Sequence, residues 1–300
     1  MSLFDELVDE ALKHKQDLAP LRVVVEKELL HHDIMLALSS AGMLTKLTFI
    51  GGTCLRACYG SNRLSEDLDF TGGADFNRES LTELARVLVS TLKAKYGLEV
   101  EVAEPVREEG NVDTWKLKVQ TRPGRKDLPA QRINIDVCSI PSYQPQPMLL
   151  LNPYGVDMGT SGLILQAETR EEIYADKIVA FALRPNRIKN RDLWDMVWLR
   201  QQGVTPQLDL IGKKLSDHHC KQDEFLTLFK SRSELLDTDP KIVLEFRKEM
   251  SRFLPGDLVA QTVNEPAFWT FLVGHIRELY VTTEKALTGA ENVQGVGFKM

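Results

Sequence analysis

The chain is poor in cysteine, and the few cysteines it has are not arranged in pairs. Four occur in 300 residues, and none forms a C-x-x-C motif. A chain of this length with so few thiols cannot depend on a disulfide framework, and it lacks the paired spacing of a structural zinc site. We therefore expect reduced, mostly buried thiols at Cys54, Cys58, Cys138 and Cys220.

Long apolar runs are missing as well. No stretch approaches the roughly 18–20 consecutive apolar residues that a membrane-spanning helix needs. The first residues, Met1 to Leu7, are acidic and amphipathic, whereas a secretory signal peptide begins with basic residues and an apolar core. We expect a cytoplasmic protein with no membrane partner.

Positive charge is not in excess, because 37 Lys and Arg residues stand against 43 Asp and Glu residues, a net charge of −6. This balance argues against a large nonspecific nucleic-acid surface, since affinity for phosphate backbones depends on clustered cations. Two local basic clusters remain, and each is either a solvated loop or a contact to RNA or nucleotide. They are Arg184, Arg187, Lys189 and Arg191, and Arg122, Arg125 and Lys126.

The patterns that are present describe a globular protein of two halves, with 43% hydrophobic and 27% charged residues. Apolar residues recur at helical spacing before residue 43 and over 77–96, which predicts helices there. Between residues 98 and 138, several stretches alternate apolar and polar residues, which predicts strands. Residues 139–162 read as an irregular crossing loop, and the chain after residue 169 is helical in pattern. We predict an α+β fold, with an α/β domain over 1–165 and a helical domain over 166–300.

The most informative stretch is Gly51-Gly52-Thr53. Residues 47–50 before it read as a short buried strand, and residues 53–59 after it read as a helix. A helix that starts directly after a glycine turn presents free backbone N–H groups, and such helix starts bind phosphate. The pattern indicates a phosphate-binding turn.

Two carboxylates one residue apart follow, at Asp67 and Asp69. Alternate side chains of a strand share a face, so both would point to one place. A third acid, Asp136, lies near the end of the alternating strand 132–138 and could complete the set as a metal ligand or as a general base. Mg²⁺ prefers hard oxygen ligands, so we predict a metal site of these three acids, although a strand-terminal Asp also commonly caps a turn.

Four segments together resemble a known family. They are Gly51-Gly52-Thr53, the string Arg63-Leu64-Ser65-Glu66-Asp67-Leu68-Asp69-Phe70, Glu172-Ile173-Tyr174-Ala175-Asp176-Lys177, and Arg191-Asp192-Leu193-Trp194-Asp195. In order and spacing they resemble the AbiEii/AbiGii-type toxins of the DNA polymerase beta-like nucleotidyltransferase superfamily. The resemblance implies a mixed-sheet nucleotidyltransferase domain. Thr stands where the wider superfamily usually has Ser, and it keeps the hydroxyl.

The resemblance also implies roles for residues outside the three acids. Lys177 would give a positive charge to a triphosphate, although an ion pair with Glu172 or Asp176 on its own helix is the competing interpretation. Asp192 would position the nucleotide or Lys177, with Arg191 beside it. Arg63 could contact a phosphate, or pair with Glu66 or Asp67 for structural reasons.

The implied activity is metal-dependent transfer of a nucleotide from an NTP, with Mg²⁺ or Mn²⁺, to an acceptor that is an RNA such as tRNA. The resemblance further implies a toxin paired with a separately encoded antitoxin. Two alternatives remain open at this stage. One is an NTP-binding interaction protein that does not transfer, and the other is a nucleotidyltransferase that modifies a small molecule such as an antibiotic.

Overall fold

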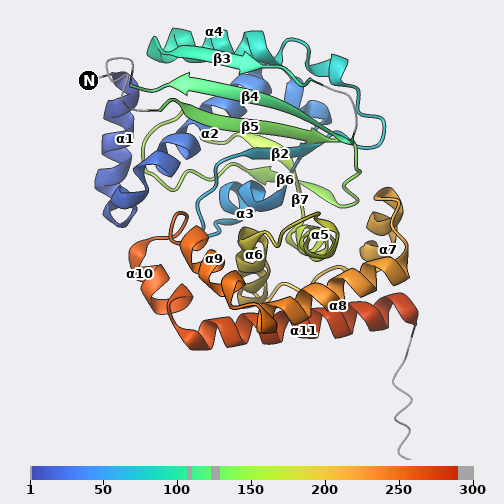
Figure 1. Cartoon of the computed structure of the whole chain (residues 1–300). Coiled ribbons are helices and arrows are strands. Elements are labelled where there is room, and N and C mark those ends of the chain that lie inside the picture. The colour runs from blue at the N-terminus through green and yellow to red at the C-terminus, as the bar shows by residue number, and fades with distance from the viewer. Residues whose placement is uncertain (1, 107–109, 123–128, 290–300) are drawn as a thin grey trace, which may run out of the picture.

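The computed structural model describes residues 2–106, 110–122 and 129–289, and it confirms the predicted α+β fold. A sheet with its own helices occupies one half of the molecule, and a layer of helices formed by the C-terminal part of the chain occupies the other (Figure 1). Part of the second basic cluster, with Arg125 and Lys126, lies outside the described residues.

The described residues form one mixed sheet of seven strands in the order β3-β4-β5-β2-β1-β7-β6. The strands are β1 (Thr48–Ile50), β2 (Leu68–Thr71), β3 (Glu99–Ala103), β4 (Val112–Gln120), β5 (Gln131–Cys138), β6 (Pro145–Leu149) and β7 (Ile164–Glu168). β2 pairs parallel to β5 and β1 parallel to β7, while the other neighbours are antiparallel. The register aligns Ile50, Asp69, Asp136 and Thr114 in one row across four strands.

The helices of the first half surround this sheet. They are α1 (Leu3–His14), η1 (Gln16–Leu21), α2 (Arg22–Ser40), η2 (Met43–Lys46), α3 (Gly51–Tyr59), η3 (Arg78–Leu81) and α4 (Leu84–Tyr96). α2 contacts β5, α4 contacts β3, and α3 packs on β1 and β2. The single helix expected over 77–96 is divided, because Asn77 caps the short turn η3 through the N–H of Glu79 before α4 begins.

Two strands fall where the sequence predicted a loop and the start of the helical part. β6 lies at the sheet edge and contains Pro145 and Pro147, which an edge strand tolerates because only one of its sides pairs with a neighbour. β7 is only five residues long and ends one residue before the cap of the next helix, so its alternation is too brief to stand out. The division expected between residues 165 and 166 therefore falls inside β7.

The helical region follows β7. Its elements are α5 (Arg170–Leu183), α6 (Asn190–Gln201), α7 (Leu208–Asp217), α8 (Gln222–Thr238), α9 (Pro240–Met250), α10 (Gly256–Leu258), the short π-helical turn η4 (Val259–Val263) and α11 (Pro266–Thr288). α5 and α6 contact α3, so the two halves meet around that short helix. Among the described residues, no helix combines the length and the apolar character needed to cross a membrane.

Candidate active site

The turn from β1 into α3 depends on its two glycines. Gly51 has a φ of +75°, a left-handed conformation that glycine adopts without strain. A Cβ atom at Gly51 would lie 3.1 Å from Oδ2 of Asp69, and a Cβ at Gly52 would collide with the guanidinium of Arg63. The turn therefore brings the main chain directly against Asp69 on one side and Arg63 on the other.

The N-terminus of α3 is open. Ile50, which precedes the helix, has no side chain able to accept a hydrogen bond from the first N–H groups. Such free N–H groups, together with the positive end of the helix dipole, favour an anion. Gly51 and Gly52 both line a cavity of about 550 Å³, so this helix end can receive an anion bound there.

Asp69 and Asp136 line the same cavity from adjacent strands. Oδ1 of Asp136 is buried and has no hydrogen-bond partner among the described residues. Burial is the main cause that raises the pKa of Asp136; a hydrogen bond from Thr114 opposes it, and the charges of Asp69 and Asp67 add to it. Two carboxylates on adjacent strands in a partly buried site therefore favour binding of a proton or a cation.

Asp67 belongs to the same strand face but is placed differently. Its Oδ1 accepts a hydrogen bond from the backbone N–H of Asn134 at 3.0 Å, and its side chain does not line the cavity formed by the described residues. Asp67 therefore joins β2 to β5 and lies beside the other two acids. The register of β2 and β5 does bring all three predicted acids to one region.

Lys177 on α5 lines the cavity and belongs to a buried cluster of ion pairs. Its Nζ lies 2.5 Å from Oδ1 of Asp192 and 3.0 Å from Oδ2 of Asp195. Burial by itself lowers the pKa of Lys177, but these two carboxylates outweigh it, so the pKa stands above its ordinary value. Lys177 is thus a fixed positive charge, held by α6 and not by Glu172 or Asp176 of its own helix.

Asp192 is the centre of that cluster. Burial raises its pKa, but the charges of Lys177, Lys189 and Arg184 outweigh burial and hold the pKa well below its ordinary range. Asp192 is consequently ionised at neutral pH. It lines the cavity together with Lys177, as the predicted positioning role requires.

Arg63 has a structural partner that sequence reasoning missed. Its Nε and Nη2 donate to the two carboxylate oxygens of Asp195 at 2.8 and 2.9 Å, and the side chain is only 3% exposed. Neither Glu66 nor Asp67, the partners considered from the sequence, pairs with it in the described part of the chain. Arg63 does not line the cavity either. It joins the loop before β2 to α6.

Thr53, the third residue of the predicted phosphate-binding turn, does not line the cavity. Its side chain is 2% exposed, and its hydroxyl hydrogen-bonds the hydroxyl of Ser65 and the carbonyl oxygen of Asp67. The same segment is held from α2, because Glu28 accepts the N–H of Ser65 at 2.7 Å. The Thr53 hydroxyl therefore fixes the loop that carries Asp67, and only the backbone N–H of this residue remains as a phosphate donor.

The basic segment before α6 divides between two surfaces. Lys189 lines the cavity, and the charges of Asp192 and Asp69 both act on it. Arg191 lines a neighbouring groove instead, with its Nε 3.3 Å from Oε1 of Glu249. The sequence marked Lys189 only as part of a basic cluster, because an isolated lysine before a helix carries no signal of its own.

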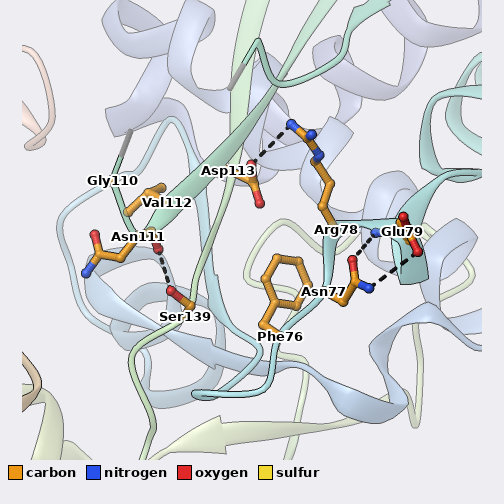
Figure 2. Close-up of a pocket in the computed structure, with 9 residues that line it drawn as sticks. All are labelled: Phe76, Asn77, Arg78, Glu79, Gly110, Asn111, Val112, Asp113 and Ser139. Carbon is orange, nitrogen blue, oxygen red and sulfur yellow. Dashed lines mark hydrogen bonds and ion pairs between the residues drawn. The ribbon is translucent and has the colours of Figure 1, made fainter. Parts of the chain in front are cut away.

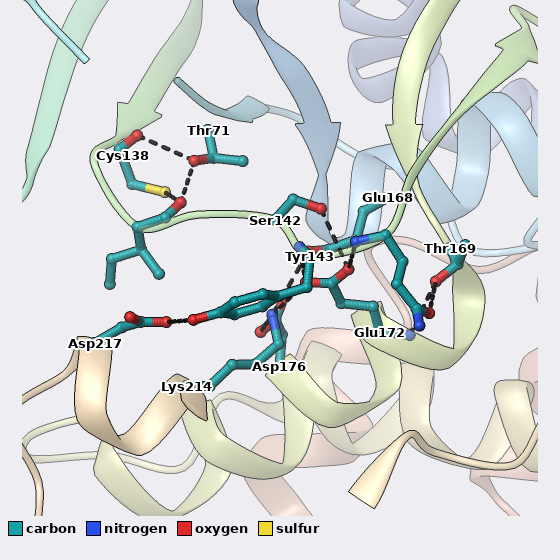
Figure 3. Close-up of polar contacts among 12 residues, drawn as sticks. Thr71, Cys138, Ser142, Tyr143, Glu168, Thr169, Glu172, Asp176, Lys214 and Asp217 are labelled. Atoms are coloured by element: carbon teal, nitrogen blue, oxygen red, sulfur yellow. Dashed lines mark hydrogen bonds and ion pairs between the residues drawn. The ribbon is translucent and has the colours of Figure 1, made fainter. Parts of the chain in front are cut away.

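A second buried lysine occupies another part of the cavity (Figure 3). Nζ of Lys214, on α7, lies 2.5 Å from Oδ1 of Asp176 and 2.8 Å from Oε1 of Glu172. Burial is the main cause that raises the pKa of Glu168, which completes this group at the end of β7. The acids sit at positions i, i+4 and i+8, so one lysine ties the strand end and the first turns of α5 to α7.

A smaller pocket of about 290 Å³ shares Asn111 and Val112 with the main cavity (Figure 2). The polar groups there engage one another. Arg78 lies 3.5 Å from Asp113, and Ser139 donates to the carbonyl oxygen of Asn111 at 3.3 Å. The convergent acids and the open helix end belong to the main cavity, which we take as the candidate active site.

The residues present fit a divalent cation. Within the described residues, no three His, Cys, Asp or Glu side chains already converge as a ligand group. However, Asp69 and Asp136 are hard oxygen donors on neighbouring strands, and a buried oxygen of Asp136 has no partner. These two carboxylates would hold a cation, whose charge would lower their mutual repulsion, with Asp67 adjacent as a further donor.

Comparison with solved structures gives the same architecture. The chain is similar to MenT4, the nucleotidyltransferase toxin Rv2826c of Mycobacterium tuberculosis H37Rv, with a TM-score of 0.55 and 16% identity over 95% of this chain and 99% of that one. It also matches JHP933 of Helicobacter pylori, with a TM-score of 0.46 and 16% identity over 93% and 95% of the two chains. At such low identity, the MenT4 likeness establishes the fold alone.

A comparison with curated proteins returns no match. A family model does match, over residues 33–273, and its description is "Nucleotidyl transferase AbiEii toxin, Type IV TA system". The matched residues include the glycine turn, the three acids and the Lys177–Asp192 cluster. Since the match covers most of the sequence, the chain belongs to the AbiEii family of nucleotidyltransferase toxins from type IV toxin–antitoxin systems.

Proposed function

We propose that this chain transfers a nucleotide from an NTP to a hydroxyl group of an RNA, with Mg²⁺ or Mn²⁺ bound at Asp69 and Asp136. The hydroxyl oxygen forms a bond to the α-phosphorus, the bond between the α- and β-phosphates breaks, and pyrophosphate leaves. The observation that carries the proposal is the row formed by Ile50, Asp69 and Asp136, which sets an open helix N-terminus beside two carboxylates on adjacent strands. Phosphate and metal sites side by side are what nucleotidyl transfer requires.

The triphosphate would lie between α3 and α5. The backbone N–H groups after Gly51 would donate to phosphate oxygens, and the ammonium groups of Lys177 and Lys189 would neutralise phosphate charge from the other side. Asp192 holds Lys177 at 2.5 Å, so this lysine keeps one orientation before the nucleotide arrives. Such fixed charges cost no reorganisation when the transition state forms.

Asp69 and Asp136 would hold the metal, with Asp67 as an additional oxygen donor. When bound, the cation would lower the charge repulsion between an attacking oxygen and the phosphate. Asp136 has a second role in this proposal. Its Oδ1, the oxygen that has no partner among the described residues, would take the proton of the acceptor hydroxyl.

The acceptor and the biological setting follow from the family in this proposal. An RNA such as tRNA would be the acceptor, and a separately encoded antitoxin would counteract the enzyme. The activity would take place in the cytoplasm, where NTP and RNA are available.

A labelling experiment tests the proposal directly. The purified chain would be incubated with Mg²⁺, total RNA and each α-labelled NTP in turn, and the products separated on a denaturing gel. We expect label on a discrete RNA band with at least one NTP. Intact NTP binding without label on any RNA would contradict transfer to RNA and favour an NTP-binding interaction protein.

A further inference from the structure

A groove of about 390 Å³ lies next to the active-site cavity, between the segment before α6 and the end of α9. Five cationic side chains line it, in a chain whose net charge is −6. We call it the basic groove and define it by Arg187, Lys189, Arg191, Lys248 and Arg252.

The acids of the groove are largely neutralised. Glu66 pairs with Lys27 at 2.9 Å, and Glu249 pairs with Arg191 at 3.3 Å. In the described part of the chain, no ion pair joins a carboxylate to Arg187, Lys189, Lys248 or Arg252. Glu245 is the remaining acid of the lining. The groove is therefore a local positive surface on an acidic protein, which suits a polyanion.

Two of the cations lie over one aromatic ring. The guanidinium carbons of Arg191 and Arg252 lie 4.9 and 5.6 Å from the ring centroid of Phe253, which is itself buried. Cation–π contacts restrict these side chains before any ligand binds. A restrained guanidinium plane can stack on an unpaired base as well as pair with a phosphate.

Lys189 joins the groove to the site of chemistry. It lines both the groove and the cavity, and it lies in the field of Asp69 and Asp192. The groove therefore leads past Lys189 to the cavity that Asp69 lines. Guanidinium planes stack on bases that are unpaired, so this path suits a single-stranded end better than a duplex.

We propose that the basic groove holds the single-stranded end of the acceptor RNA, with Lys248 and Arg252 contacting phosphates upstream of the nucleotide that Lys189 guides to Asp69. The inference rests on the proposed transfer to RNA. It adds a surface on α9 and on the turn after it, which no motif of the sequence indicated.

The test is a binding measurement with the full chain. Fluorescence anisotropy of a labelled 12-nucleotide RNA would be recorded at several salt concentrations for the wild type and for the double variant Lys248→Glu/Arg252→Glu. We expect at least about tenfold weaker binding and a salt slope reduced by about 0.7 for each lost phosphate contact. NTP binding should stay unchanged, because neither residue lines the cavity.

A matched control carries the same change of net charge elsewhere. Lys46 and Lys93 are exposed and lie outside the groove, so Lys46→Glu/Lys93→Glu should bind the RNA like the wild type. The inference is overturned if the groove variant binds like the wild type, if the control loses as much affinity, or if a duplex of the same sequence binds equally well. Absence of NTP-dependent labelling, with RNA binding still dependent on the groove, would instead remove only the proposed transfer.

Discussion

Asp69 and Asp136 are direct neighbours in the parallel pairing of β2 with β5, although 67 residues separate them along the chain. Both line the cavity beside Gly51. Their adjacency makes Asp136 the sharpest single test of the chemistry, because its carboxylate can be replaced by an amide of nearly the same shape.

The variant Asp136→Asn should bind NTP but lose transfer by about 10²–10⁴-fold, the usual contribution of a positioned acid–base group. The amide can neither accept the acceptor proton nor hold a cation as a charged ligand. Labelling rates and NTP affinity would be measured on the same preparation. Asp75→Asn, at an exposed position, is the control and should react normally. Wild-type transfer rates in Asp136→Asn would exclude this residue from the reaction.

The stability difference between Asp136→Asn and the wild type should depend on pH. The pKa of Asp136 is raised from 3.8 in the folded protein, so folding favours its protonated form. Its contribution to stability is therefore present below the unfolded pKa and is lost as pH rises through the folded pKa. Asp136→Asn should melt at a higher temperature than the wild type near pH 7–8 without metal, and the difference should vanish below about pH 4.

Thermal melts across that pH range give the measurement, and added Mg²⁺ gives an independent check. A cation that binds the folded state raises the melting temperature. We expect Mg²⁺ to stabilise the wild type more than Asp136→Asn. Equal stabilisation of both proteins by Mg²⁺ would contradict Asp136 as a metal ligand.

The role of Gly51 in the turn after β1 can be tested by comparison with Gly42, a glycine of similar conformation elsewhere in the chain. Gly51 and Gly42 have similar φ values of +75° and +71°, but a Cβ at Gly42 would meet nothing within 4 Å, whereas one at Gly51 would meet Asp69. Gly42→Ala should therefore report the backbone cost alone, about 1 kcal/mol or slightly more. Gly51→Ala should cost more, and it should also weaken NTP binding.

Urea unfolding and NTP titration of both variants separate these effects. The expected pattern is reduced stability in both variants and reduced NTP affinity in Gly51→Ala alone. If Gly51→Ala binds NTP like Gly42→Ala, the turn after β1 does not approach the nucleotide.

Features encoded by neighbouring residues can be predicted from the sequence, whereas contacts between distant residues cannot. The turn at Gly51 and the alternation that contains Asp136 are local patterns, and the registers of β1 with β2 and of β2 with β5 place them in one row of the sheet. The partners of Arg63 and Lys214 lie 132 and up to 46 residues away, and no local spacing encodes them. Such pairs form only because tertiary packing brings α6 and α7 to the sheet.

The strands β6 and β7 show the same limit in another way. Pro145 and Pro147 oppose a strand on propensity, and the edge position that makes them acceptable is a property of the whole sheet. Thr53 shows a related limit. Its place after a glycine pair predicts a phosphate contact, but its hydroxyl hydrogen-bonds Ser65 and the carbonyl oxygen of Asp67 in the nearby loop.

Arg63 provides the last prediction, since the sequence left its role open. Its Nε and Nη2 both donate to the carboxylate of Asp195, and Asp195 also contacts Lys177. Arg63→Lys should lose the bidentate hydrogen bonding while keeping the charge, at a cost of about 1–3 kcal/mol in unfolding free energy. NTP affinity should fall little, because Asp192 still holds Lys177. A large loss of NTP affinity at unchanged stability would show instead that Arg63 reaches the phosphates.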